Sequence, residues 1–171
     1  MEAVEVELTA GDPERAAEIG REGVVELETL GEQGWLSTVA GYTAEALYRL
    51  GCDDEAWEFT NKAEATGAAD DVITNMLFRQ VRAKLLARRG DLDDAERLAL
   101  EAVALGEPTD APDVKASARR DLATVCAAAG KRTEALDALA EAQALYELKG
   151  HTAGVSQVER MRSELVATLG T

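Results

Sequence analysis

The chain has 171 residues, of which 46% are hydrophobic, so it can bury the core of one domain and is too apolar for wholesale disorder. Its 33 acidic and 18 basic side chains give a formal net charge of −15, which argues against a general nucleic-acid binder and against docking on anionic lipid. No apolar run reaches the length of a membrane span, and the first residues lack the regions of a signal peptide. Two cysteines provide no disulfide framework, so we expect a cytoplasmic protein.

The composition favours an all-α fold, because alanine supplies 32 residues and aromatic side chains only seven. The first predicted helix ends at about residue 10. In chain order, the other predicted helices cover residues 13–30, 35–50, 54–66, 72–89, 92–105, 112–129, 133–149 and 152–169. No stretch is typical of a strand, and no linker is long enough to separate two domains. We therefore expect one domain over residues 1–171.

A repeat of about 40 residues organises these helices. Glycines that end one helix and open a turn recur at Gly11, Gly51, Gly90 and Gly130. An alanine follows each glycine five residues later, at Ala16, Ala56, Ala95 and Ala135. The position twelve residues after each glycine also holds a small residue, at Gly23, Ala63, Ala102 and Ala142. The position seven residues before each glycine holds Val4, Ala44, Ala83 and Ala123. Small residues at fixed depth allow helices to approach closely, so we expect four helix pairs over residues 1–31, 35–67, 72–106 and 112–150, plus a capping helix over 152–169. A second glycine set, Gly31, Gly67, Gly106 and Gly150, is expected to close the second helix of each pair.

The two ends of the array differ. The last predicted helix carries a narrow apolar stripe and polar side chains elsewhere, as a solvated cap requires. The first is short, and its apolar side chains Val4, Val6 and Leu8 need cover. Either this edge meets a partner or was cut from a longer array, or the first helix is naturally short. A homodimer through a terminal helix is one form of the first alternative.

These glycine and alanine positions resemble the tetratricopeptide-repeat family, with two antiparallel helices per unit. The resemblance covers nearly the whole chain but departs in its period, which is about 40 residues instead of 34. That spacing is similar to the C-terminal repeat regions of large bacterial signalling and transcriptional regulators. The resemblance implies an α-α superhelix, a right-handed solenoid, that acts as a regulatory or scaffolding module.

Catalytic and metal-binding patterns are weak. His151 is the single histidine and is expected to cap or lie on the surface, since a zinc site needs three or four ligands. The pairs Asp53–Asp54 and Asp93–Asp94 open helices, where the helix dipole already explains them. We expect no enzyme activity and no cofactor. Trp35, Trp57 and Phe59 are expected to fill the core, although Trp57 and Phe59 cannot both face one side of a helix.

In the resembled family the first helix of each pair lines a concave groove, which is where we expect function. The candidate partner-binding residues are Tyr42, Glu45, Tyr48, Arg49, Gln80, Lys84, Arg88, Arg120 and Thr124. The family's carboxylate clamp is not reproduced. Charge is uneven, since residues 1–73 carry 18 acidic and four basic side chains, and a basic partner or simple solubility explains that excess.

Three functions remain open from these features. The first is a non-enzymatic scaffold that binds a protein or peptide in the groove. The second is a sensor for a small ligand or signal peptide in a bacterial regulator, and the third is a self-association module.

Overall fold

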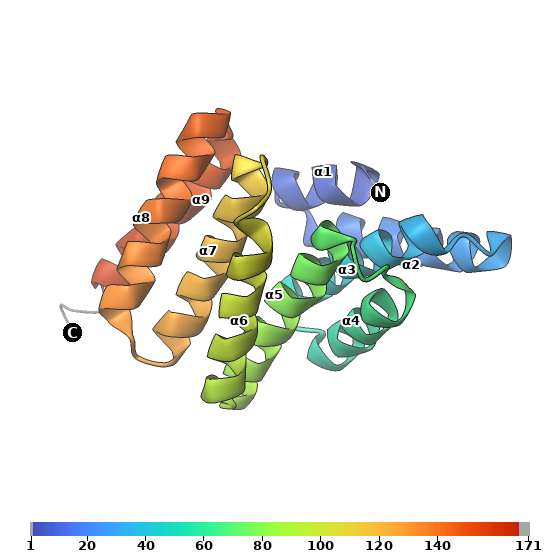
Figure 1. Cartoon of the computed structure of the whole chain (residues 1–171), viewed down its shortest axis with the longest axis horizontal. Helices are drawn as coiled ribbons and strands as arrows, with labels where there is room; N and C mark the ends of the chain where they lie inside the picture. The colour runs from blue at the N-terminus through green and yellow to red at the C-terminus, as the bar shows by residue number, and fades with distance from the viewer. Residues whose placement is uncertain (1, 168–171) are drawn as a thin grey trace.

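The computed structural model describes residues 2–167, and helices joined by short loops make up this part of the chain (Figure 1). They are α1 (Glu2–Ala10), α2 (Pro13–Leu30), α3 (Gln33–Arg49), α4 (Asp53–Thr66), α5 (Val72–Arg89), α6 (Leu92–Gly106), α7 (Pro112–Ala128), α8 (Arg132–Lys149) and α9 (Thr152–Ala167). The predicted all-α class is confirmed, and each described helix end lies within two residues of its predicted position. The predicted end of the last helix, at residue 169, lies outside the described residues.

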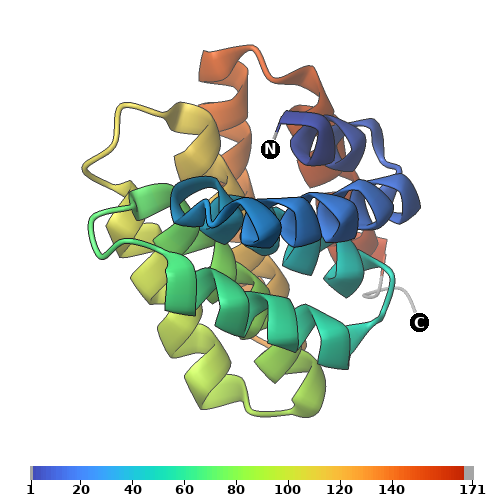
Figure 2. The same cartoon turned by 90° about the vertical axis from the view of Figure 1, so that its right-hand side faces the viewer.

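Helices α1 to α8 pack as consecutive antiparallel pairs, and α9 packs on α8. Each pair also leans on the next, because α3 contacts α5 and α5 contacts α7. The first helices of the pairs therefore line one side of the array. The array curves so far that α1 reaches α9, as the blue and red helices in Figures 1 and 2 show.

Local chemistry explains where the helices begin and end. The Asp12 carboxylate accepts a hydrogen bond from the Arg15 N–H at 2.9 Å, and Pro13 opens α2 where its missing donor costs nothing. Gly31, Gly90 and Gly150 end their helices in the left-handed conformation that other residues avoid. Helix α3 begins two residues earlier than predicted because the Glu32 side chain caps it through the Gly34 N–H.

Two glycines of the second set end their helices without the left-handed conformation of Gly31 and Gly150. Gly67 has a φ of −72°, and Gly106 is the last residue of α6 and is buried. A Cβ at Gly67 would lie 2.9 Å from Thr74 Cγ2, and one at Gly106 would lie 2.9 Å from Met76 Cε. These two glycines therefore serve a close approach to α5, and neither has the positive φ that marks the turn glycines.

The repeated small positions lie between the helices, as predicted. Ala16, Ala56, Ala95 and Ala135 have no exposed surface, and neither have Ala63, Ala102 and Ala142. Gly23, the remaining small position, is only partly buried. Helix α3 is the most enclosed element, with an almost unbroken buried run from Leu36 to Leu47.

Candidate functional site

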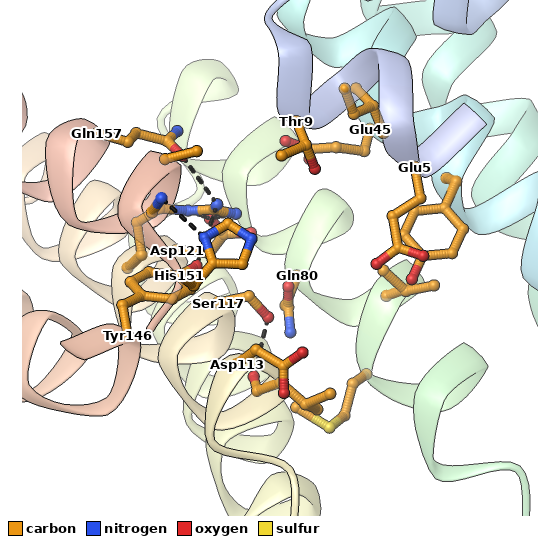
Figure 3. A pocket seen from close by; sticks show the side chains of 18 of the residues that line it. Glu5, Thr9, Glu45, Gln80, Asp113, Ser117, Asp121, Tyr146, His151 and Gln157 are labelled. Atoms are coloured by element: carbon orange, nitrogen blue, oxygen red, sulfur yellow. Dashed lines mark hydrogen bonds and ion pairs between the residues drawn. The ribbon is translucent and has the colours of Figure 1, made fainter. Parts of the chain in front are cut away.

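A cavity of about 250 Å³ occupies the concave side of the array (Figure 3). Its walls come from α1, α3, α5, α7 and α9, with Tyr146 added by α8, so every helix that opens a pair contributes and the cap helix closes the far side. Residues Ile73, Met76, Leu77, Val81 and Val114 give it an apolar part, and the other walls are polar. Its size is slightly below the range of about 300–1,000 Å³ typical of ligand pockets.

A buried chain of charges forms the base of the cavity. The Lys84 Nζ on α5 lies 2.5 Å from Glu45 Oε2 on α3 and 2.8 Å from Asp121 Oδ2 on α7. Arg49 pairs with Glu45 at 2.8 Å, and Arg120 pairs with Asp121 at 2.7 Å. The network thus joins three successive helix pairs with three cations and two carboxylates.

The surroundings of Glu45 and Lys84 favour the charged form of both side chains. Burial alone would raise the pKa of Glu45, but the charges of Lys84, Arg49 and Arg120 outweigh it and lower the pKa to about 2. Burial opposes the charged form of Lys84, but Asp121 and Glu45 reverse that effect and raise its pKa. The base of the cavity is therefore an ionic layer in which each carboxylate contacts two cations.

The α9 wall is organised around Arg120. Its guanidinium donates to Gln157 Oε1 at 3.2 Å and approaches the Tyr146 hydroxyl at 3.5 Å. His151 accepts a hydrogen bond at Nδ1 from the Gly154 N–H at 2.8 Å, which caps the start of α9 as the sequence predicted. Figure 3 shows Gln157, His151 and Tyr146 together on this wall.

A second pair of carboxylates, Glu5 on α1 and Asp113 on α7, lines another part of the cavity. Figure 3 shows Glu5 across the cavity from His151, with Asp113 between the two walls. Tyr42 on α3 contacts Glu5, and the pKa of its phenol is raised by burial and then by the Glu5 charge and hydrogen bond. The Tyr42 hydroxyl therefore keeps its proton beside the Glu5 carboxylate.

Six of the nine predicted groove residues lie in or directly beneath the cavity. Tyr42, Glu45, Arg49, Gln80 and Arg120 line the cavity. Lys84 lies beneath it with 3% of its surface exposed, as the hub of the ionic network.

The other three predicted groove residues lie outside the cavity. Arg88 lies over the Tyr48 ring at 3.6 Å and pairs with Asp53 at 2.5 Å. The Thr124 hydroxyl donates to the Arg120 carbonyl at 3.3 Å. These side chains are thus engaged within the array itself.

Sequence reasoning did not identify the cavity residues contributed by α1, by the start of α7, by α8 and by α9. They include Glu5, Asp113, Tyr146, His151, Gln157 and Arg160. Their meeting depends on the curvature that brings α1 to α9, and the repeat spacing contains no signal for it. The apolar stripe of the short first helix was the nearest indication, because Val4 and Leu8 are buried while Val6 is 62% exposed.

The prediction for the aromatic residues was partly wrong. Trp35 is 55% exposed at the start of α3, so it does not fill the core. Trp57 and Phe59 are both partly buried, because each packs against the core cluster to which α3 contributes. The guanidinium groups of Arg82 and Arg89 on α5 also lie over the Trp57 ring. Cys52 is exposed and Cys126 is buried, and both are free thiols.

No group of three or more potential ligands is placed to hold a metal ion within residues 2–167. Over the same residues, none of the helices combines the length and the apolarity that crossing a membrane requires.

Comparison with known proteins agrees with this geometry. Residues 74–147 match the family model of the tetratricopeptide repeat. The structure resembles a putative kinesin light chain of Podosopora anserina with nearly identical TPR-like repeats, at 16% identity and a TM-score of 0.57 over 99% of this chain and 93% of that one. It also resembles BtubC from P. vanneervenii, at 16% identity and a TM-score of 0.56 over 98% of this chain and 78% of that one. Such identities show the fold alone, and no match was found among curated proteins.

Proposed function

We propose that the protein is a non-catalytic scaffold that binds a partner protein or peptide in its concave cavity. Residues 74–147 match the family model of the tetratricopeptide repeat, and the helix-pair array continues on both sides of them. Domains of this family generally serve as protein-interaction scaffolds and are typically non-catalytic. The observation that carries the proposal is the cavity itself. It is concave and partly apolar, and a rigid ionic base positions its polar groups.

Rigidity favours binding here. The ionic network ties α3, α5 and α7 together, so the polar side chains of the cavity are held before a partner arrives. Preorganised groups lose less conformational freedom on association, which leaves more of the contact energy for affinity. Tyr42 and Tyr146 add aromatic surface of the kind enriched at binding hot spots.

Selection from a random peptide display library tests the scaffold function. The wild-type chain should enrich peptides, and Ser117→Trp should lose them, because Ser117 lines the cavity and a tryptophan there fills it. Ser163→Trp is the matched control, since Ser163 is exposed on α9 and lies outside the cavity. Retained binding by Ser117→Trp, with an unchanged circular dichroism spectrum, would place recognition elsewhere.

A small-ligand sensor is the second candidate, and the closure of the array by α1 favours it. A cavity bounded on both sides by α1 and α9 is too short for a long peptide that passes through it. This function predicts that a metabolite mixture raises the melting temperature of the wild type but not of Ser117→Trp. If the ligand is a protein surface, the metabolite mixture should leave the melting temperature of the wild type unchanged.

The setting of the scaffold is a further part of the proposal. We propose a cytoplasmic regulator of a bacterial signalling or transcription system, in which the array transmits partner binding to another domain. The two free cysteines support a reducing compartment. A reporter fusion whose activity follows occupancy of the cavity tests this transmission, with Ser117→Trp as the silent variant.

A further inference from the structure

The carboxylates of the cavity differ in how they are neutralised. Glu45 and Asp121 each contact two cations at the base. Glu5 and Asp113 take part in no ion pair within residues 2–167. The carboxylates at the base of the cavity therefore have cationic partners, whereas Glu5 and Asp113 have none in the described part of the chain.

Asp113 presents the stronger anomaly. Its Oδ1 atom is shielded from solvent and has no hydrogen-bond partner in the described part of the chain. A buried carboxylate oxygen without a donor is unfavourable, so such atoms in native proteins usually have a partner from protein, water or ligand. Its position in the first turn of α7 accounts for a negative charge there, but it does not supply the missing donor.

Tyr42 adds the second property that a cation site needs. Tyr42 lines the cavity beside the Glu5 carboxylate. An aromatic ring next to carboxylates stabilises an ammonium or guanidinium group through its π face. Arg160 on α9, the exposed cation of the rim, forms no ion pair with Glu5 or Asp113.

We propose that the cavity receives one basic side chain, lysine or arginine, from the partner segment, with its cationic head between Asp113 and Glu5. The aliphatic stem of that side chain would lie against Leu77 and Val114, which supply apolar wall. The volume of about 250 Å³ accommodates one such side chain and not an extended peptide. The net charge of −15, concentrated in residues 1–73, attracts a basic segment toward this site. This inference rests on the scaffold function proposed above.

The experiment titrates the labelled full chain with capped five-residue peptides and follows backbone amide shifts by NMR. The probes are alanine peptides with a central arginine, lysine, glutamine or glutamate. We expect the arginine and lysine peptides to shift amides of Gln80, Ser117 and Gly154, which line the cavity. The glutamine and glutamate peptides should shift none of them.

Charge-neutralising variants make the test specific. Asp113→Asn and Glu5→Gln should each weaken the arginine peptide at least about tenfold, because each removes a charged partner. Asp110→Asn and Glu2→Gln are matched controls, since Asp110 lies in the loop before α7 and Glu2 lies on α1, and both are exposed and outside the cavity. Both controls should stay within about twofold of the wild type.

Four results would overturn the inference. They are equal binding of the glutamine peptide, equal weakening by the controls, no cavity shift with any basic peptide, or binding of methylguanidinium alone as tight as that of the arginine peptide. The last would identify a free small cation as the ligand. If library-selected peptides still require an unblocked cavity while these probes fail, the scaffold function stands and only the basic side chain is excluded.

Discussion

Lys84 on α5 and Asp121 on α7 form an ion pair of 2.8 Å between Nζ and Oδ2, with at most 5% of either side chain exposed. Because Glu45 on α3 holds the same ammonium, one lysine links three consecutive helix pairs. Buried ions are stable only when they are paired, so this network depends on all of its members. The network forms the base of the cavity, whereas Glu5 and Asp113, which have no ion pair in the described part of the chain, line its other walls.

Lys84→Met should destabilise the array strongly. It removes the shared cation and leaves Glu45 and Asp121 with less compensation in a buried place, which typically costs about 3–5 kcal/mol. Urea unfolding measures the loss. Lys131→Met is the matched control, because its partner Glu96 lies at the surface, and it should cost less than about 1 kcal/mol. Equal losses for the two variants would show that the buried network is not a stabilising link.

Acid should weaken the fold through Glu45. Its folded pKa of about 2 lies below the ordinary value of 4.5, so its contribution is complete above pH 4.5 and is lost as pH falls toward 2. The wild type should therefore lose on the order of 3 kcal/mol more than Glu45→Gln across that interval. Unfolding free energies measured at several pH values test this. Glu58→Gln, at an exposed site on α4, should follow the wild-type curve, and a Glu45→Gln curve parallel to the wild type would contradict the assignment.

The helices were predictable from sequence because local chemistry sets their ends. Gly90, Pro13 and the Asp12 cap act on their own neighbours, so short patterns identify them. The floor of the cavity followed from helical register, since Tyr42, Glu45 and Arg49 recur on one face of α3.

The remaining walls depend on how far the array curves. That curvature accumulates from contacts such as Gly41 against Leu77, where an added Cβ would lie 3.1 Å from the Leu77 Cβ. Contacts of this kind join residues far apart in the sequence, so no local pattern reports them. The placement of Glu5 and Asp113 in one cavity was for that reason not predictable from sequence. The exposed position of Trp35 reflects a helix that starts earlier than its apolar run suggested.

Two glycines of α2 should respond in opposite ways to alanine. A Cβ at Gly20 would come within 3.0 Å of Thr43 Cβ and closer still to its Oγ1, which donates to the Val39 carbonyl at 2.7 Å and has no room to move. Gly20→Ala should therefore cost about 1–3 kcal/mol through overpacking. At Gly23 the nearest atom would be Val39 Cγ1 at 3.6 Å, an ordinary contact, so Gly23→Ala should be neutral or stabilise α2 by up to about 1 kcal/mol. Thermal unfolding of both variants decides the point, and a stabilised Gly20→Ala would show that α2 and α3 are not in close contact there.

Helix α1 should contribute to the stability of this chain by covering its core. Val4 is 1% exposed in the core shared with α2 and α3, whereas Val6 on the same helix is 62% exposed. Val4→Asp buries an unpaired carboxylate and should lower the unfolding free energy by more than about 3 kcal/mol, whereas Val6→Asp should change it by less than about 0.5 kcal/mol. Urea unfolding supplies these values, and sedimentation equilibrium over a wide concentration range shows whether α1 also joins two chains. If Val6→Asp abolished a wild-type dimer while Val4→Asp left stability unchanged, α1 would be an interface between chains and not the cover of its own core.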